Sequence, residues 1–342
     1  MEKSYPFDFG DVIVRVRDFI SDDLPKCLSL IRMGHDPSFS EKRFRWLHEL
    51  APLSPSSIAV CEEGNEIVGI YSVIRKTVRL GPRVFVGGRD IDPVVHPSYR
   101  GKGVFSRLLE FGLANFQGID FFFNFANTAS SAGFRKHGWK EIETLDDYVC
   151  QLGFSNPFSK EFFLWLATLA RHKRRTSMEC REINQEEASL LLSEPSFLKN
   201  LFPPTNRFWV ERSPDYIKWR YLKHPTHDYL WFFMGDPGSG GGLAICRVDK
   251  GENRLNIIDF WGLGVEPDLD GWLSTWKKSC PGTLATVWST IPQNSISCFI
   301  TNPIQRGKGR KFLVRPFPGR DMPIQLTTPG GWFITRGDLE IS

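Results

Sequence analysis

A short turn of glycines and basic residues separates two apolar stretches in the first half of the sequence. Residues 96–103, HPSYRGKG, follow a β-branched run and precede an amphipathic stretch. Gly101 and Gly103 permit positive φ and let backbone N–H groups approach a ligand closely. With a helix starting here, those amides and the helix N-terminus form an anion site, to which Arg100 and Lys102 add full positive charges. Phosphate oxygens are the ligand that this pattern favours.

The turn is neither of two common nucleotide-binding motifs. A P-loop needs GxxxxGK[ST], which is absent, and a dinucleotide fingerprint needs a third glycine where Ser106 stands. The alternative is an ordinary connection between a strand and a helix, with solvated cations. The letters RGKG recur at residues 306–309, where a strand rather than a helix is expected next. We interpret that second copy as a solvated loop.

Two carboxylates lie just before the turn. Asp90 and Asp92 are two residues apart in an expected strand, so both side chains should face the same way. A pair of carboxylates can raise the pKa of one member and thereby create a general base. The alternatives are that the two residues cap a bulge or pair with Arg89. His96 titrates near neutrality and is another candidate base, although a histidine before proline favours a packing role.

Alternating strand and helix signals surround these residues. Ser21 or Asp22, and later Ser40, are helix caps followed by apolar residues at helical spacing. A Gly-Asn turn at 64–65 joins two β-branched runs and indicates a hairpin. FFFNFAN, residues 121–127, is continuously apolar and predicts a buried strand. The other expected elements are strands over 12–17, 83–95 and 146–152 and helices over 104–116 and 130–138.

Length and composition are those of a globular protein with two domains of ordinary size. The chain has 342 residues, of which 41% are hydrophobic and 24% charged. A net charge of +4 is too small to predict nucleic-acid binding. The 7 cysteines show no metal-ligand spacing, so we expect reduced thiols, no metal and a cytoplasmic location. The N-terminus is not typical of a signal peptide, and no stretch reaches the ~20 apolar residues of a bilayer span, so no stable membrane insertion is expected.

The second half of the sequence repeats the first in outline. On an expected helix in each half, a tryptophan precedes a proline by six residues: Trp46 before Pro52, and Trp219 before Pro225. A strand-turn-strand unit follows in both places. A spacing of roughly 170 residues indicates duplication of a whole domain.

Two stretches of the first half match a known pattern. Residues 94–109, VVHPSYRGKGVFSRLL, carry Arg-x-x-Gly with Arg100 and Gly103 at the matching positions, and residues 127–139 read NTASSAGFRKHGW. Together with the order of expected elements over 10–152, they resemble the GNAT superfamily of N-acetyltransferases and its acyl-CoA-binding motif. The two-domain arrangement resembles tandem-GNAT proteins of bacteria.

The resemblance implies an α/β fold with a mixed sheet, in which a GNAT-like domain is followed by a degenerate GNAT-like domain. The expected boundaries are 1–152 for the catalytic domain and 153–178 for a linker helix with a basic end. The second domain covers 179–342 and lacks the glycine-rich turn at the corresponding place. We therefore expect it to bind the acceptor or to have a structural role.

The resemblance also implies the residues that bind acetyl-CoA. The pantetheine arm is expected to pair with the backbone of Val94 and Val95, in a gap between two strands, and Asn127 to hydrogen-bond near it. Phe105 stands where the family has a small residue, so its bulk must point away from the ligand. The diphosphate is expected to bind the turn and the first residues of the helix: Arg100, Gly101, Lys102, Gly103, Val104, Phe105 and Ser106.

The catalytic step implied by the family is direct attack of an amine on the thioester. Because an amine is mostly protonated at neutral pH, a base is needed, and we prefer Asp92, with Asp90 as the second candidate. The family's usual acid is a tyrosine where Phe134 stands. Ser131 and Tyr148 are possible substitutes, or the thiolate leaves unassisted.

The sequence thus predicts an acetyl-CoA-dependent N-acyltransferase acting on a small-molecule amine, for which an amino sugar of surface-polysaccharide synthesis is one candidate. Two alternatives stay open. Phe134 in place of the usual tyrosine favours a non-catalytic acyl-CoA-binding or scaffold protein, and Phe105 is compatible with a longer acyl donor. The sequence gives no oligomeric state.

Overall fold

The computed structural model describes residues 4–8, 13–145, 147–151, 180–195, 197, 206–236, 240–249, 254–261, 284–288, 300–301 and 309–339. The chain forms two compact units. The first comprises residues 1–78, 84–143 and 311–327, and the second comprises 79–83, 144–310 and 328–342. The expected linker helix over 153–178 and most of the second RGKG copy lie outside the described residues.

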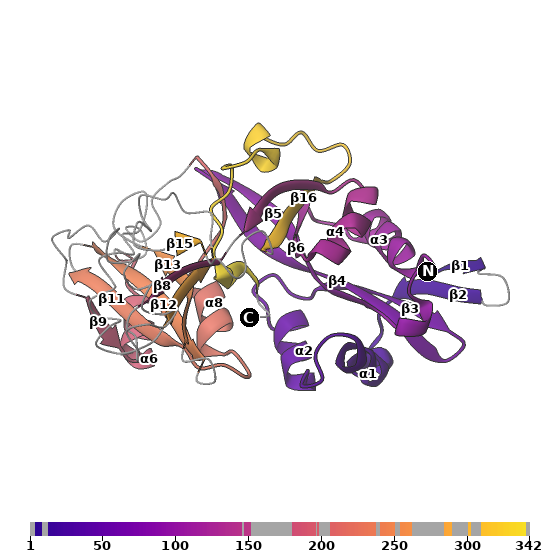
Figure 1. Cartoon of the computed structure of the whole chain (residues 1–342), viewed down its shortest axis with the longest axis horizontal. Coiled ribbons are helices and arrows are strands. Elements are labelled where there is room, and N and C mark those ends of the chain that lie inside the picture. Colours follow the sequence, from indigo (N-terminus) through magenta and orange to yellow (C-terminus); the bar gives the residue numbers. More distant parts are fainter. Residues whose placement is uncertain are drawn as a thin grey trace, which may run out of the picture. The chain divides into compact units, whose positions relative to one another are not determined.

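The first unit is built on a mixed β-sheet, as the sequence predicted. The main path of the sheet follows the order β1-β2-β3-β4-β5-β6-β16-β7 (Figure 1), and β10 (Phe208–Val210) pairs with β4 off this path. Parallel pairing joins β5 to β6, and antiparallel pairing joins β6 to β16. The strands are β1 Ser4–Asp8, β2 Ile13–Asp18, β3 Ser57–Glu63, β4 Glu66–Leu80, β5 Arg83–Val95, β6 Phe121–Ala126, β7 Lys140–Leu145 and β16 Arg310–Pro316.

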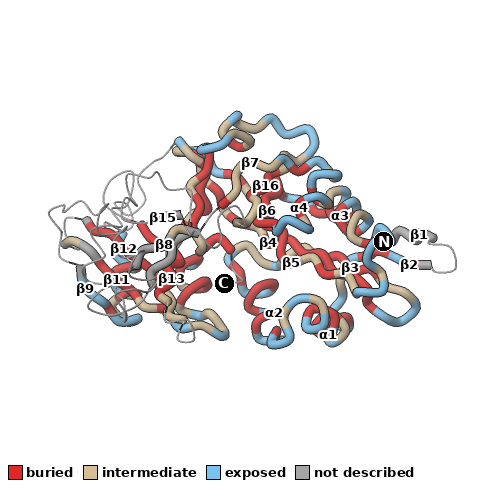
Figure 2. The backbone as a smooth tube through the Cα atoms, in the orientation of Figure 1, coloured by how far each residue is buried: buried red, intermediate tan, exposed pale blue. Residues whose placement is uncertain are grey.

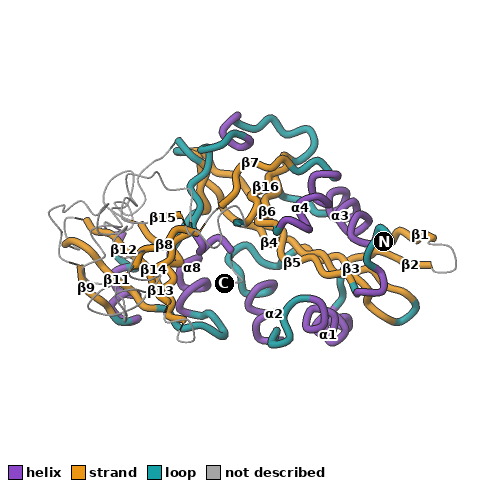
Figure 3. The backbone as a smooth tube through the Cα atoms, in the orientation of Figure 1, coloured by secondary structure: helices purple, strands orange, loops and turns teal. Residues whose placement is uncertain are grey.

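Helices cover both faces of this sheet (Figure 3). One face packs against α1 (Leu24–Gly34) and α2 (Glu41–His48), and the other packs against α3 (Val104–Asn115) and α4 (Thr128–Lys136). Each face has its own apolar core, so the sheet is buried on both sides. A strand in its centre must therefore be apolar along its whole length.

The burial of the central strands follows from their sequences (Figure 2). All residues of β6 are buried, as its continuous apolar run predicted. In β3, Val60 contributes to the core under α1, whereas its neighbour Cys61 contributes to the core under α3, because successive side chains of a strand alternate between faces. The expected cap of α2 is present, since the Ser40 hydroxyl accepts a hydrogen bond from the Arg43 amide at 3.2 Å.

The second unit contains another mixed sheet, with the order β15-β8-β14-β13-β12-β11-β9. β13 and β14 pair in parallel, as β5 and β6 do in the first sheet, and the next strand, β8, is antiparallel to β14, as β16 is to β6. Its strands are β8 Asp147–Gln151, β9 Cys180–Ile183, β11 Leu230–Asp236, β12 Gly240–Asp249, β13 Arg254–Trp261, β14 Leu284–Trp288 and β15 Ile300–Thr301. Helices α6 (Gln185–Leu191) and α8 (Pro214–Ile217) belong to this unit.

The two sheets exchange strands, so they do not follow the contiguous ranges 1–152 and 179–342. Strand β8, which the sequence analysis placed at the end of the first domain, pairs instead with β14 and β15. Strand β16, from the last part of the chain, pairs with β6 over 311–316 in the first unit. Without β16, the apolar strand β6 would have an unpaired edge. β16 pairs with that edge, and its side chains Phe312, Leu313 and Val314 are 0% exposed.

A buried charged network holds the second unit together. The Arg212 guanidinium, 1% exposed, donates to Asp259 at 3.1 Å and lies 2.8 Å from Asp338. The Tyr221 hydroxyl also donates to Asp259, at 2.6 Å, and Thr335 Oγ1 donates to it at 2.7 Å. Burial raises the pKa of Asp338, and the Arg212 charge opposes that rise.

Arg212→Met should lower the free energy of unfolding by about 3–5 kcal/mol, because it leaves two buried carboxylates without their cation. Chemical denaturation followed by fluorescence measures this loss. Arg181→Met removes an ion pair to Glu187 that is solvent-exposed, so this control should cost less than about 1 kcal/mol. Equal losses in the two variants would contradict the expectation that the buried network contributes more to stability than the exposed ion pair.

No helix within the described ranges is long and apolar enough to cross a bilayer.

Candidate active site

The glycine-rich turn has the backbone geometry that its sequence predicted. After a 3-10 turn at Pro97–Tyr99, Gly101 and Gly103 have φ of 77° and 83°. Gly103 is the N-cap of α3 and supplies no side-chain cap. The first N–H groups of a helix have no partner within the helix, so these amides are donors available to an anion at the positive end of the helix dipole.

The surroundings of the turn are open and positively charged. A Cβ atom on Gly101 would meet nothing within 4 Å, so this glycine is required by its φ and not by crowding. Arg100 and Lys102 are both exposed. Arg100 Nε donates to the Val95 carbonyl at 3.3 Å, and Lys102 Nζ lies 5.1 Å from the centre of the Tyr99 ring.

Strands β5 and β6 separate in the stretch of β5 that leads to the turn. Their parallel register runs from Gly87 opposite Phe121 to Arg89 opposite Phe123, and the described strands pair no further. On its other side β5 stays attached to β4, since the His96 amide donates to the Val68 carbonyl at 2.9 Å. The backbone of residues 90–95 therefore has an edge facing β6 that no strand occupies.

The side chains of the expected pantetheine-binding residues anchor this edge. Val94 is 4% exposed and packs under α1, where a Cβ on Gly34 would come within 2.5 Å of Val94 Cγ1. Val95 faces the opposite core, beside α3. The alternation leaves the backbone groups of both residues between the two faces.

Phe105 does not point at the turn. Its ring packs edge-on against Phe134, with centroids 5.2 Å apart, and a Cβ on Gly133 in α4 would lie 2.6 Å from it. Phe134 in turn contacts Trp139, at 5.3 Å. Both phenylalanines are thus part of the core between α3 and α4, as is Val104, whereas Ser106 is half-buried at the start of the helix.

Asp90 is buried where the two strands separate. It is 0% exposed, and its Oδ1 accepts a hydrogen bond from the Tyr71 hydroxyl at 2.6 Å. Burial raises the pKa of Asp90 to about 7, against the opposing effects of Tyr71, Arg89, Trp139 and Arg315. Asp92 lies two residues further along β5, and its side chain falls outside the described residues.

The free energy of unfolding should depend on pH because of Asp90. Its folded-state pKa is raised, so between about pH 3.8 and pH 7 the folded state binds more protons than the unfolded state. The contribution of this group is therefore fully present below about pH 3.8 and is lost as the pH rises to about 7. Asp90→Asn should match the wild type near pH 4 and be more stable than it by about 1–3 kcal/mol at pH 8. Denaturation across this range measures the difference, and a constant difference would contradict the assignment.

The other expected site residues have clear local roles. Asn127 caps α4, with its Oδ1 accepting from the Ser130 amide at 2.8 Å, and the cap does not use its amide nitrogen. Ser131 is 2% exposed and donates to the Thr128 carbonyl at 3.0 Å, so its hydroxyl is already engaged in the helix. Tyr148 lies in β8 and therefore belongs to the other sheet.

Sequence reasoning missed three residues around Asp90. Tyr71 comes from β4, Trp139 follows α4, and Arg315 comes from β16, where its Nε donates to the His137 carbonyl at 2.8 Å. A tyrosine in the hairpin strand could have been considered as a partner for a buried carboxylate. Arg315 carries no such signal, because it lies more than 200 residues from Asp90 in the sequence.

The part of the chain that the structure describes contains no group of three or more side chains arranged to hold a metal ion.

Comparison with known proteins decides the family. Residues 15–142 match the family model described as Acetyltransferase (GNAT) domain. This chain contains a GNAT domain. The matched range includes the turn and the stretch where β5 and β6 separate. The match confirms the resemblance that the sequence motifs indicated. No curated protein is significantly similar to the sequence.

Solved structures share the GNAT fold over most of the chain. A probable N-acyltransferase of Enterococcus faecalis, described as a conserved protein of unknown function, has a TM-score of 0.64 at 12% identity, over 89% of this chain and 72% of that chain. A GCN5-related N-acetyltransferase of Anabaena variabilis has a TM-score of 0.59 at 12% identity, over 94% and 84%. A GCN5-related glucosamine N-acetyltransferase region of a fungal multi-domain β-N-acetylglucosaminidase has a TM-score of 0.53 at 15% identity, over 90% and 38%. At these identities the likeness concerns the fold alone.

Proposed function

We propose that the protein is an acetyl-CoA-dependent N-acyltransferase and that its GNAT domain carries out the chemistry. One observation carries the proposal: an uncapped helix N-terminus with two positive-φ glycines follows the stretch of β5, residues 90–95, that has no strand on its β6 side. A helix N-terminus binds phosphate, and a strand edge binds an extended amide chain. Acetyl-CoA carries both groups.

In the proposed complex, the amides of residues 101–106 bind the diphosphate, with Arg100 and Lys102 adding positive charge. The open edge at Val94 and Val95 pairs with the pantetheine, and the free amide nitrogen of Asn127 donates to it. Phe105, packed against Phe134, leaves the turn unobstructed.

In the proposed reaction, Asp92 takes a proton from the ammonium of the acceptor, and the neutral amine attacks the thioester carbonyl. A C–N bond forms, the C–S bond breaks, the thiolate of coenzyme A leaves with the electron pair, and the nitrogen releases its surplus proton to solvent. Phe134 cannot donate a proton, and a thiol with a pKa of about 8.5 can leave without an acid. Asp90, which is buried and bonded to Tyr71, is a positioning residue in this scheme.

Asp92→Asn should lower kcat at least about 100-fold, the usual contribution of a general base, without changing the Kd for acetyl-CoA. A thiol-release assay with a panel of amines measures the first quantity, and calorimetry measures the second. Unchanged turnover would remove Asp92 from the mechanism. An acetyl-CoA affinity that falls in parallel with turnover would instead make it a binding residue.

For the acceptor, we propose a small-molecule amine, with an amino sugar of surface-polysaccharide synthesis as the candidate to test first. Support comes from architecture alone, including the likeness in fold to the fungal glucosamine N-acetyltransferase region. We propose that the second unit is a degenerate GNAT domain that helps to bind the acceptor. The matching strand orders of the two sheets support this. A comparison of acetyl-, butyryl- and palmitoyl-CoA in the same assay tests which acyl chain length the enzyme accepts.

Phe134 supports one other candidate function, a non-catalytic acyl-CoA-binding protein, because the core position that it fills offers no acid. Binding of acetyl-CoA without turnover on any amine of a broad panel would favour this alternative. The buried thiols of Cys27 and Cys61, which form no disulfide, support the proposal of a reducing, cytoplasmic location.

A further inference from the structure

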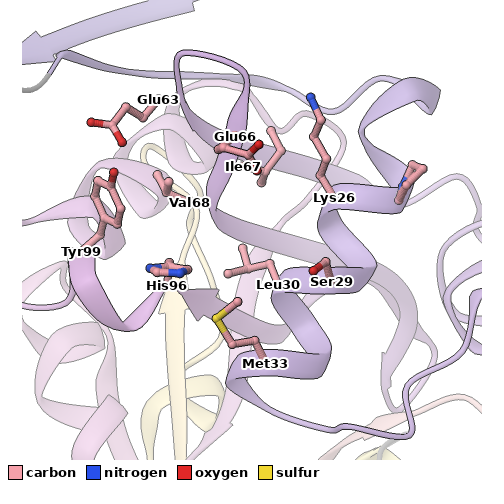
Figure 4. Close-up of a pocket in the computed structure, with 11 residues that line it drawn as sticks. Lys26, Ser29, Leu30, Met33, Glu63, Glu66, Ile67, Val68, His96 and Tyr99 are labelled. Carbon is pink, nitrogen blue, oxygen red and sulfur yellow. The ribbon is translucent and has the colours of Figure 1, made fainter.

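A groove of about 440 Å³ opens beside the glycine-rich turn, on the face of the first unit that carries α1 (Figure 4). One wall is the exposed side of α1, with Ser29 and Met33, and another is the tip of the β3–β4 hairpin, with Glu63 and Glu66. His96 closes it at the start of the turn. This volume is within the range of small-molecule sites.

Negative charge is in excess along this groove. Within the described part of the chain, the carboxylates of Glu63 and Glu66 form no hydrogen bond or ion pair. The one cationic side chain in the lining, Lys26, is already engaged: its ammonium donates to the carbonyl and side-chain oxygens of Asn65, at 2.6 and 2.7 Å. Two acceptor groups are therefore available to a positively charged ligand.

The floor of the groove is apolar. Leu30, Ile67 and Val68 are 2–7% exposed and form its base, whereas Met33 beside them is 56% exposed. A flexible, polarizable methionine at the edge of a hydrophobic floor adapts to ligands of different shape. The lining thus suits a molecule with an aliphatic part and a charged end.

The groove is separate from the place where acyl transfer is proposed. His96 follows Asp92 by four residues, or roughly 13 Å of extended chain. Between them, Val94 packs so closely against Gly34 that a Cβ atom on Gly34 would come within 2.5 Å of Val94 Cγ1. This contact closes the α1 face of β5 next to the groove.

We propose that this groove is a second binding site, which takes a primary ammonium on a short aliphatic chain. The ammonium lies between Glu63 and Glu66, and the chain lies on Leu30 and Ile67. The site does not depend on the proposed acyl transfer, because all of its contacts are made without acetyl-CoA. A ligand there touches His96, the first residue of the turn.

The test uses 1,4-diaminobutane as the probe, titrated into the full chain by calorimetry at low salt without acetyl-CoA. Glu63→Gln/Glu66→Gln should weaken binding about tenfold or more, the effect of two partly exposed charge contacts. Ser29→Trp fills the groove without changing its charge and should also weaken binding. The matched control is Glu41→Gln/Glu49→Gln, which removes two carboxylates that pair with Arg45 on α2, and it should leave the affinity unchanged.

Absence of binding to the wild type would overturn the proposal. So would equal affinity in the groove variants and the wild type, since the probe would then bind elsewhere. Failure of acetyl-CoA to raise the melting temperature would contradict the proposed acyltransferase alone. The binding of 1,4-diaminobutane would still test the groove.

Discussion

Gly103→Val should abolish the rise in melting temperature that we expect saturating acetyl-CoA to give the wild-type protein. Gly103 has a φ of 83°, a conformation that a β-branched residue rarely adopts, and its amide lies at the start of α3. Relaxation of that strain would turn the amide away from the proposed diphosphate site. A ligand at 100 times its Kd stabilises a protein by about 2.7 kcal/mol, and this whole contribution is expected to disappear. Differential scanning fluorimetry with and without acetyl-CoA measures it.

Gly118→Val is the matched control, because Gly118 also has a positive φ, 72°, but lies beyond the far end of α3. Backbone strain of about 1–2 kcal/mol is expected in both variants. Only the variant at residue 103 should lose the response to acetyl-CoA. A full response in Gly103→Val would rule out the turn as the diphosphate site.

Leu313→Asp should unfold the first unit even though residue 313 lies near the C-terminal end of the sequence. Leu313 is 0% exposed in β16, in the core beneath α3 and α4. A carboxylate there loses the burial of leucine and leaves a charge without a partner, which together cost about 4 kcal/mol or more. Near-ultraviolet circular dichroism and acetyl-CoA binding should both be lost.

Asp321→Lys reverses a charge at an exposed position of the same segment and should change neither signal. A second arm uses residues 1–152 expressed alone, which lack β16 and should bind no acetyl-CoA. Binding by that fragment would contradict the requirement for the exchanged strand.

Local patterns predicted the parts of the site that depend on local physics. The glycines of the turn, the apolar β6 and the cap at Ser40 each follow from a few neighbouring residues. The exchange of β8 and β16 could not be predicted this way, because RKFLVRP has the pattern of any half-buried strand and carries no mark of which sheet it joins. The surroundings of Asp90 were missed for the same reason, since Arg315 reaches it only through that exchange.

The exchanged strand also sets the order of events during synthesis. When Ala126 leaves the ribosome, the chain up to Pro316 has still to be made before β6 gains its neighbour. At about 5–20 residues per second, the apolar edge of that strand waits roughly 10–40 s. A nascent chain in this state is a substrate for holdase chaperones, and slow translation of the second half would lengthen its exposure to aggregation.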